Sequence, residues 1–244
     1  MTILMKMTRS KLAVIITAAG ASTRLGAGIK KEYLPYKSGT VLSACATVFL
    51  TAQCTGMELA AMVVTCPPGG ENDARNALFS DKDFCAAIGA TPLQIVAGGT
   101  TRQASVFEGL RAVKKICPDT NYVLIHDGAR PFVSQKLVRI VAEATAEHKA
   151  AVPGITPTDT QKEVDADGFI VRHLARNSLC AVQTPQGFDF LPLYQAHSEL
   201  SQKNSRDFTD DTEIWAEFYG PVKVVPGEPS NIKITYPADL ERLC

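Results

Sequence analysis

The sequence predicts an α/β protein with three layers, in which helices cover both faces of a mostly parallel β-sheet. Short apolar runs, largely of β-branched residues, alternate along the chain with longer segments of helical periodicity. The apolar runs are continuous rather than alternating, which is typical of parallel strands that are buried on both faces. A third observation is the turn sequence Asp167-Gly168 within an extended segment of mixed polarity, residues 162–174, which predicts a separate β-hairpin.

The apolar runs place strands at residues 12–17, 59–65, 93–97, 122–126, 150–155, 222–225 and 232–235. Helices are expected at 40–53, 72–88, 103–116, 134–148 and 189–203, with a short one from Pro237, because proline suits a first helical turn. A lone two-stranded hairpin is marginal in water, so residues 157–176 are expected to form a projecting arm that clasps a second subunit. No repeat or linker interrupts the chain, and residues 1–244 are expected to form a single domain with this arm as an insertion.

Composition and charge narrow the class of protein. The 244 residues are 45% hydrophobic, and 25 Lys and Arg balance 25 Asp and Glu, which gives no electrostatic case for a nucleic-acid or membrane partner. Seven cysteines without a Cys-x-x-Cys pair argue against a disulfide framework and for a reducing, cytoplasmic location. Lys6, Arg9 and Lys11 before the apolar run at 12–16 faintly imitate a signal peptide, but the run is short and leads directly into a glycine-containing loop. We interpret it as a buried first strand.

The first candidate site follows that strand. Residues 17–26 are mostly small and include Arg24, and Lys30 and Lys31 come shortly afterwards. Ligands of parallel sheets bind at the carboxyl ends of the strands, and small residues let backbone N–H groups approach a phosphate chain. Arg24 and Lys31 can then place positive charge on a phosphoryl group, although the loop matches neither the Walker A nor the dinucleotide-binding pattern. The alternative is an ordinary glycine-containing turn with solvated cations.

Two further predicted strands are followed by residues that could bind a ligand. After the strand at 93–97, the pair Gly98-Gly99 allows close approach to a flat base that Ser105 could hydrogen-bond, unless this is only a capped turn. After the strand at 122–126, Asp127 is well placed to hold Mg²⁺, unless it merely forms an ion pair with Arg130. His126 is interpreted as a structural hydrogen-bonding residue, because the four histidines are dispersed.

Weaker motifs complete the pattern: Thr158–Lys162, Arg176, Gln183–Phe188, Phe208–Thr212 and Asn231–Thr235. In this order the motifs resemble the 2-C-methyl-D-erythritol 4-phosphate cytidylyltransferase family of the non-mevalonate isoprenoid pathway, over residues 11–240. The resemblance implies a Rossmann-like nucleotidyltransferase fold, a homodimer joined through the arm, and Mg²⁺ as cofactor, held by Asp127. CTP and a sugar-alcohol phosphate would be the small-molecule partners.

The family's functional residues carry over position by position. The resemblance implies that CTP contacts Ala18, Ala19, Gly20, Gly98, Gly99, Ser105, Asp127 and Gly128. It implies catalytic roles for Arg24, Lys31, Arg176 and Lys233. It implies contacts to the acceptor from Arg130, Thr160, Thr184 and Thr209, with Thr160 and Arg176 reaching across the dimer from the arm. A lone lysine on a strand such as Lys233 would otherwise point to solvent.

The chain departs from the family pattern at several positions. Ser22 replaces a loop glycine, Lys30 a proline, Glu32 a glutamine, Thr100 an aspartate and Gly128 an alanine. Lys30 and Glu32 are expected to pair either with each other or with the triphosphate. The cations remain, so the reaction class is expected to be unchanged.

The expected reaction is an in-line attack of the acceptor phosphate on the α-phosphorus of CTP, with release of pyrophosphate. A phosphate monoester is already ionised near neutral pH, so no general base is needed, and the protein contributes position and charge. Three alternatives stay open: D-ribitol 5-phosphate as acceptor, another nucleotide base, and a non-catalytic nucleotide-binding protein.

Overall fold

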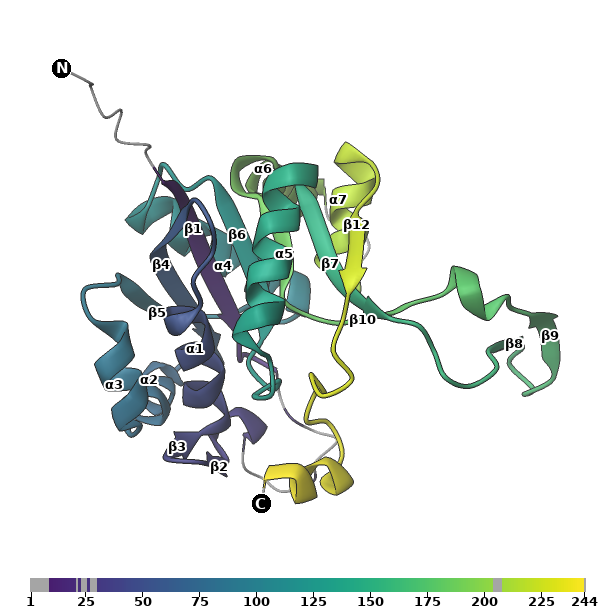
Figure 1. The fold of residues 1–244 in the computed structure, drawn as a ribbon, viewed down its shortest axis with the longest axis horizontal. Helices are drawn as coiled ribbons and strands as arrows, with labels where there is room; N and C mark the ends of the chain where they lie inside the picture. Colours follow the sequence, from purple (N-terminus) through teal and green to yellow (C-terminus); the bar gives the residue numbers. More distant parts are fainter. Residues whose placement is uncertain (1–8, 21, 23–25, 27–29, 204–207, 244) are drawn as a thin grey trace.

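The computed structural model describes residues 9–20, 22, 26, 30–203 and 208–243 (Figure 1). Its centre is an eight-stranded sheet with the strand order β10-β7-β11-β6-β1-β4-β5, in which β12 also pairs with β7. Five of the strands are β1 (Ser10–Thr17), β4 (Met57–Cys66), β5 (Leu93–Ala97), β6 (Tyr122–Asp127) and β7 (Ala150–Ile155). The others are β10 (Ala181–Val182), β11 (Gln186–Asp189) and β12 (Lys223–Pro226). The pairs β1–β4, β1–β6, β4–β5 and β7–β12 are parallel, so the predicted α/β class and mostly parallel sheet are confirmed.

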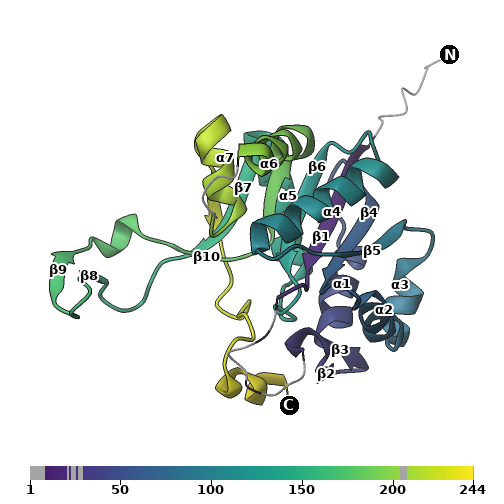
Figure 2. The ribbon, with the colours of Figure 1, turned by 180° about the vertical axis from the view of Figure 1, so that it is seen from behind.

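Helices cover both faces of the sheet. They are α1 (Val41–Thr51), α2 (Glu71–Phe79), α3 (Lys82–Ile88), α4 (Arg102–Ile116), α5 (Gln135–His148), α6 (Phe190–Lys203) and α7 (Asp211–Tyr219). Figure 1 shows α1 and α5 in front of the sheet, and Figure 2 shows α4 and α6 on the opposite face. Successive side chains of β1 alternate between the two layers, because Leu12, Val14 and Ile16 join one apolar core while Ala13 and Ile15 join the other. No helix in the described part of the chain is long and apolar enough to cross a membrane.

Side-chain caps explain where the helices that carry site residues begin. Thr101 Oγ1 accepts a hydrogen bond from Ala104 N at 3.1 Å and so opens α4 directly after the paired glycines. Asp210 Oδ1 accepts from Thr212 N at 2.9 Å and opens α7. These caps place Arg102 and Asp211 in the first turns of their helices.

The structure corrects two of the expected elements and adds others. The helix expected at 72–88 is two helices, because the buried Asp81 caps a new start by accepting from Asp83 N at 2.9 Å. The segment 232–235 is not a strand, and Ile234 N donates instead to Ala129 O at 2.9 Å beyond the end of β6. The strands β10 and β11 and the helix α7 were not predicted. In β11, Gly187 leaves room for Thr145, whose Oγ1 would lie 2.0 Å from an added Cβ, so packing rather than strand propensity selects this segment.

The predicted hairpin is present and projects from the sheet between β7 and β10 (Figures 1 and 2). Its strands, β8 (Lys162–Val164) and β9 (Ile170–His173), are antiparallel. Asp165 Oδ1 closes the turn by accepting from two backbone N–H groups, and Gly168 adopts a φ of 87°. Phe169 and Val171 of the arm are 71% and 58% exposed, an unusual fraction for apolar side chains.

The remaining elements are short. A small hairpin is formed by β2 (Pro35–Tyr36) and β3 (Gly39–Thr40), and 3₁₀ turns cover Lys31–Tyr33, Arg176–Ser178 and Pro237–Leu243. The last of these corresponds to the short helix expected from Pro237.

Candidate active site

A cavity of about 340 Å³ lies at the carboxyl ends of β1, β5 and β6. It is lined by Thr17, Ala19, Gly20, Ser22, Lys31, Glu32, Gly99, Thr100, Thr101, Arg102, Ser105, Asp127, Ala129, Lys233 and Thr235. The three strand ends that the sequence indicated therefore meet at one place, because β1, β5 and β6 run in the same direction and end at the same edge of the sheet. The fourth contribution, residues 233–235, comes from the far end of the chain.

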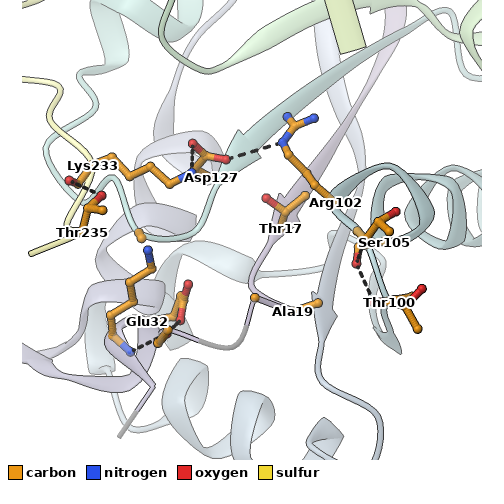
Figure 3. A pocket seen from close by; sticks show the side chains of 15 residues that line it. Thr17, Ala19, Glu32, Thr100, Arg102, Ser105, Asp127, Lys233 and Thr235 are labelled. Atoms are coloured by element: carbon orange, nitrogen blue, oxygen red, sulfur yellow. Dashed lines mark hydrogen bonds and ion pairs between the residues drawn. The ribbon is translucent and has the colours of Figure 1, made fainter. Parts of the chain in front are cut away.

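Three cations surround the carboxylate of Asp127. Its Oδ2 lies 3.0 Å from Lys233 Nζ and 3.2 Å from Arg130 Nε, and its Oδ1 lies 4.0 Å from Arg102 Nε. Figure 3 shows Lys233 and Arg102 approaching this carboxylate from opposite sides. Burial by itself would raise the pKa of Asp127, but the neighbouring Lys233, Arg102 and Arg130 outweigh it and hold the pKa well below its usual range. The ionised Asp127 carboxylate therefore lies within an excess of positive charge, which suits an anionic ligand.

A buried hydrogen-bond network fixes the end of β6. Thr184 Oγ1 accepts from Asp127 N at 3.1 Å and lies 3.0 Å from His126 Nδ1, while His126 Nε2 lies 3.3 Å from Arg130 O. These contacts fit a neutral ring that donates through Nε2 to the carbonyl and accepts from the hydroxyl through Nδ1. His126 therefore has the structural role that the sequence indicated. Thr184 supports the Asp127 backbone and does not line the cavity.

The buried imidazole predicts a pH dependence of stability. Burial lowers the pKa of His126 to about 4 from the ordinary 6.5, so the folded protein binds fewer protons than the unfolded chain between these values. The free energy of unfolding should then decrease as pH falls through this window, by up to about 3 kcal/mol. Denaturant titrations across the window should show this decrease in the wild type, and a smaller one in His126→Gln. The matched control His148→Gln removes an exposed histidine and should keep the wild-type slope, while a flat wild-type profile would contradict the assignment.

The glycine pair allows close packing at the other end of the cavity. A Cβ on Gly98 would lie 2.5 Å from Ala19 Cβ, and one on Gly99 would lie 2.4 Å from Ala104 Cβ. Ser105 Oγ donates to Thr101 O at 2.8 Å, which leaves its lone pairs as acceptors at the cavity wall. This end of the cavity is lined by Gly99 and by the hydroxyl side chains of Thr100, Thr101 and Ser105.

The loop after β1 contains a contact between three of the departures from the family pattern. Lys30 Nζ lies 3.5 Å from Glu32 Oε2 and also donates to Ala18 O, while Ser22 Oγ donates to the same Glu32 oxygen at 3.4 Å. The expected contact between Lys30 and Glu32 is therefore present. Burial lowers the pKa of Lys30, and the neighbouring Glu32 opposes this shift. Ser22 adopts a φ of 53°, a left-handed conformation that a glycine at this position would adopt more easily.

The structure brings many, but not all, of the predicted residues to the cavity. Those that line it are Ala19, Gly20, Lys31, Gly99, Ser105, Asp127 and Lys233. Those that do not line it are Ala18, Gly98, Gly128, Arg130, Thr160, Arg176, Thr184 and Thr209. Arg24 lies outside the described residues. The nearest of the second group act as supports, since Arg130 pairs with Asp127 and Gly128 N donates to Thr17 O at 2.9 Å.

Three predicted acceptor contacts lie away from the cavity in the single subunit. Thr160 and Arg176 are exposed residues of the arm, where Arg176 Nη1 donates to Thr158 O at 2.6 Å. Thr209 is exposed and donates to Glu213 Oε1 at 2.5 Å. None of the three therefore lines the cavity within one chain.

Sequence reasoning missed one charged residue of the cavity, Arg102, and named Glu32 only as a partner of Lys30 or of the triphosphate. Arg102 stands in the same segment as the paired glycines and opens α4, so its position after a strand end was an available signal. Its partner Asp211 is more than a hundred residues further along the chain, and no local pattern indicated the contact. The small residue Ala129 and the hydroxyls of Thr17, Thr101 and Thr235 also line the cavity and were not predicted.

The side chains of the cavity can be compared with those that usually bind the expected Mg²⁺. Among the described residues no three His, Cys, Asp or Glu side chains gather as a metal site. Mg²⁺ is commonly bound through one or two carboxylates together with the phosphates of a substrate, rather than by a cage of protein ligands. Asp127, an ionised carboxylate on the cavity wall, fits that mode of binding.

Comparisons with known proteins agree with this architecture. The family model for 2-C-methyl-D-erythritol 4-phosphate cytidylyltransferase matches residues 12–243. The chain is 34% identical over 229 residues to the 2-C-methyl-D-erythritol 4-phosphate cytidylyltransferase of Clostridium beijerinckii, which covers 94% of this chain and 95% of that protein. It is 36% identical to a bifunctional enzyme IspD/IspF of Bartonella bacilliformis over 94% of this chain, and it spans 55% of that longer protein.

The fold comparison gives the same result. The solved structure of 4-diphosphocytidyl-2C-methyl-D-erythritol synthase from Anaerococcus prevotii matches with a TM-score of 0.77 and 29% identity, over 96% of this chain and 94% of that one. The resemblance first drawn from the order of the motifs is therefore confirmed. The chain belongs to the 2-C-methyl-D-erythritol 4-phosphate cytidylyltransferase family.

Proposed function

We propose that this chain joins CTP to 2-C-methyl-D-erythritol 4-phosphate, giving 4-diphosphocytidyl-2-C-methyl-D-erythritol and pyrophosphate. Membership of the family supports the reaction. The structural observation that carries the proposal is the group of cations around one buried carboxylate, beside a wall that includes Gly99 and Ser105. Such a cavity can accept a planar base at one end and several phosphates at the other.

Charge and position supply the catalysis. Lys31 and Lys233 line the cavity, and we assign them to the phosphates, where they stabilise the charge that develops at the α-phosphorus during attack. The acceptor phosphate is the nucleophile and is already ionised near neutral pH, so no side chain needs to remove a proton. His126 is buried in a hydrogen-bond network and is not needed as a base.

Asp127 is the residue that would provide an oxygen for Mg²⁺. The cation, when bound, neutralises phosphate charge and favours the departure of pyrophosphate. Lys233 would keep its contact with the site in that state, because an ammonium can bind phosphate oxygens and a carboxylate together.

The arm is the proposed site of dimerisation. Its exposed apolar side chains need a partner, and Thr160 and Arg176 lie on it away from the cavity of their own chain. In a two-fold dimer each arm would bring these residues to the other subunit's acceptor phosphate. The described cysteines, all free thiols, support a reducing location such as the cytoplasm.

Pyrophosphate release tests the function. Purified protein with Mg²⁺ and CTP should release pyrophosphate with 2-C-methyl-D-erythritol 4-phosphate and far more slowly with D-ribitol 5-phosphate. ATP, GTP and UTP serve as controls for base selection. Release with ribitol phosphate alone would keep the chemistry and overturn the acceptor, whereas CTP binding without release for either acceptor would overturn the catalytic assignment.

A further inference from the structure

Arg102 occupies a position that its own helix disfavours. It lies in the first turn of α4, where the exposed backbone N–H groups give the helix terminus a partial positive charge that repels cations. Nevertheless it lines the cavity, between the wall formed by Gly99 and Ser105 and the carboxylate of Asp127 (Figure 3). Another part of the molecule must therefore hold the guanidinium there.

That partner is Asp211 in the first turn of α7. Its Oδ2 accepts from Arg102 Nη1 at 2.7 Å, and its side chain is 0% exposed. The contact to Asp127 is longer, at 4.0 Å, so Asp211 is the closer anchor. A buried carboxylate is tolerated only when it is paired and hydrogen-bonded, and this one is placed to meet the cation.

His197 of α6 occupies the second oxygen of Asp211. The distance from His197 Nε2 to Asp211 Oδ1 is 3.0 Å, and the imidazole, also 0% exposed, stacks on Phe107 with an interplanar angle of 17°. Its Nδ1 has no hydrogen-bond partner among the described residues, which fits the tautomer that carries the proton on Nε2 and donates it to Asp211. Burial by itself would raise the pKa of Asp211, but Arg102 and His197 outweigh it and lower the pKa, so the carboxylate stays ionised.

We propose that Asp211 and His197 are positioning residues for CTP binding: they hold the Arg102 guanidinium at the junction of the two ends of the cavity, where it donates to an anionic oxygen of the nucleotide. The hydrogen bond to Asp211 uses one of the five N–H donors of a guanidinium, so further donors can face the ligand. This inference rests on the proposed function and adds a chain of contacts that runs from α6 through α7 to the cavity.

Replacing Asp211 by Asn tests the proposal, since it keeps the shape and removes the charge. We expect the KM and the Kd for CTP to rise about tenfold, which corresponds to about 1.4 kcal/mol, because the guanidinium loses its closer anchor and keeps only the longer contact to Asp127. The KM for 2-C-methyl-D-erythritol 4-phosphate and kcat should stay within about a factor of two, because Arg102 is assigned to nucleotide binding. In an Arg102→Ala background, Asp211→Asn should give no further loss of CTP affinity, because the residue through which it acts is gone.

A second pair of variants tests His197 separately, and remains informative if Asp211→Asn does not fold. His197→Gln keeps an N–H donor and should retain CTP affinity, whereas His197→Leu removes the donor and should weaken it. Equal CTP affinities of these two variants would overturn the role given to His197.

Asp81→Asn is the matched control for Asp211→Asn. Asp81 is 3% exposed, accepts from Ser43 Oγ at 2.9 Å and does not line the cavity, so its variant should lower the melting temperature without changing the Kd for CTP. An equal loss of CTP affinity in both variants would overturn the inference, because general destabilisation would then explain it. Unchanged CTP affinity in a folded Asp211→Asn protein would also overturn it. A wild-type protein that releases no pyrophosphate would instead count against the proposed function.

Discussion

Replacing Lys31 by Ala is expected to lower kcat/KM by about a hundredfold, which corresponds to about 3 kcal/mol of transition-state stabilisation. Lys31 lines the cavity and is 8% exposed, so its charge acts where solvent screens it weakly. Its backbone N donates to Ser22 Oγ at 3.4 Å, which ties it to the loop that follows β1. Single-turnover and steady-state rates of pyrophosphate release measure the effect, and most of it should appear in kcat.

Lys82→Ala is the matched control for this variant. Lys82 is exposed at the start of α3 and does not line the cavity, so removing it changes the net charge equally without touching the site. Its kcat/KM should stay near the wild-type value. If Lys31→Ala kept turnover within about a factor of two of the control, the role assigned to Lys31 would be wrong.

Mixing two inactive variants should restore activity if the arm completes the partner's site. Lys31→Ala damages the cavity, and Arg176→Ala damages the arm, so each homodimer should be nearly inactive. After subunit exchange in an equal mixture, half of the dimers are mixed, and each mixed dimer holds one site with both residues intact. Activity should therefore return to about a quarter of the wild-type value.

The same mixture distinguishes this dimer from an arrangement in which each arm completes the cavity of its own chain. If the arm served its own cavity, both sites of a mixed dimer would lack one residue, and mixing would restore nothing. Sedimentation or light scattering of each variant should first confirm that it forms a dimer, because loss of assembly would also remove activity. A monomeric wild-type protein would contradict the proposed role of the arm.

Much of the fold could be predicted because it depends on local patterns. The continuous apolar runs that became β1, β4, β6 and β7 are mostly buried, and β5 at the edge of the sheet is partly buried, so their composition marks them in any context. The Asp-Gly turn closes the hairpin by its own backbone and side-chain hydrogen bonds. The short β11 was missed because its place in the sheet depends on the space that Gly187 leaves for Thr145 of another element.

The residues of the site also divide into those that local sequence places and those that only tertiary packing places. The sequence by itself determined that Gly20, Gly99 and Asp127 follow strand ends, and the ends of neighbouring strands in a mostly parallel sheet meet at one edge. Local order also determined that Lys31 follows the first loop. These positions depend on chain order and strand direction alone.

Only the tertiary structure decided which charges meet. Lys233 lies on an irregular segment and reaches Asp127, and Arg102 reaches Asp211 because α4 packs against α6 and α6 packs against α7. Thr184, expected at the acceptor, instead supports the backbone of Asp127. Such contacts join residues far apart in the chain, and their energies depend on distance and burial, which are defined only once the layers have packed together.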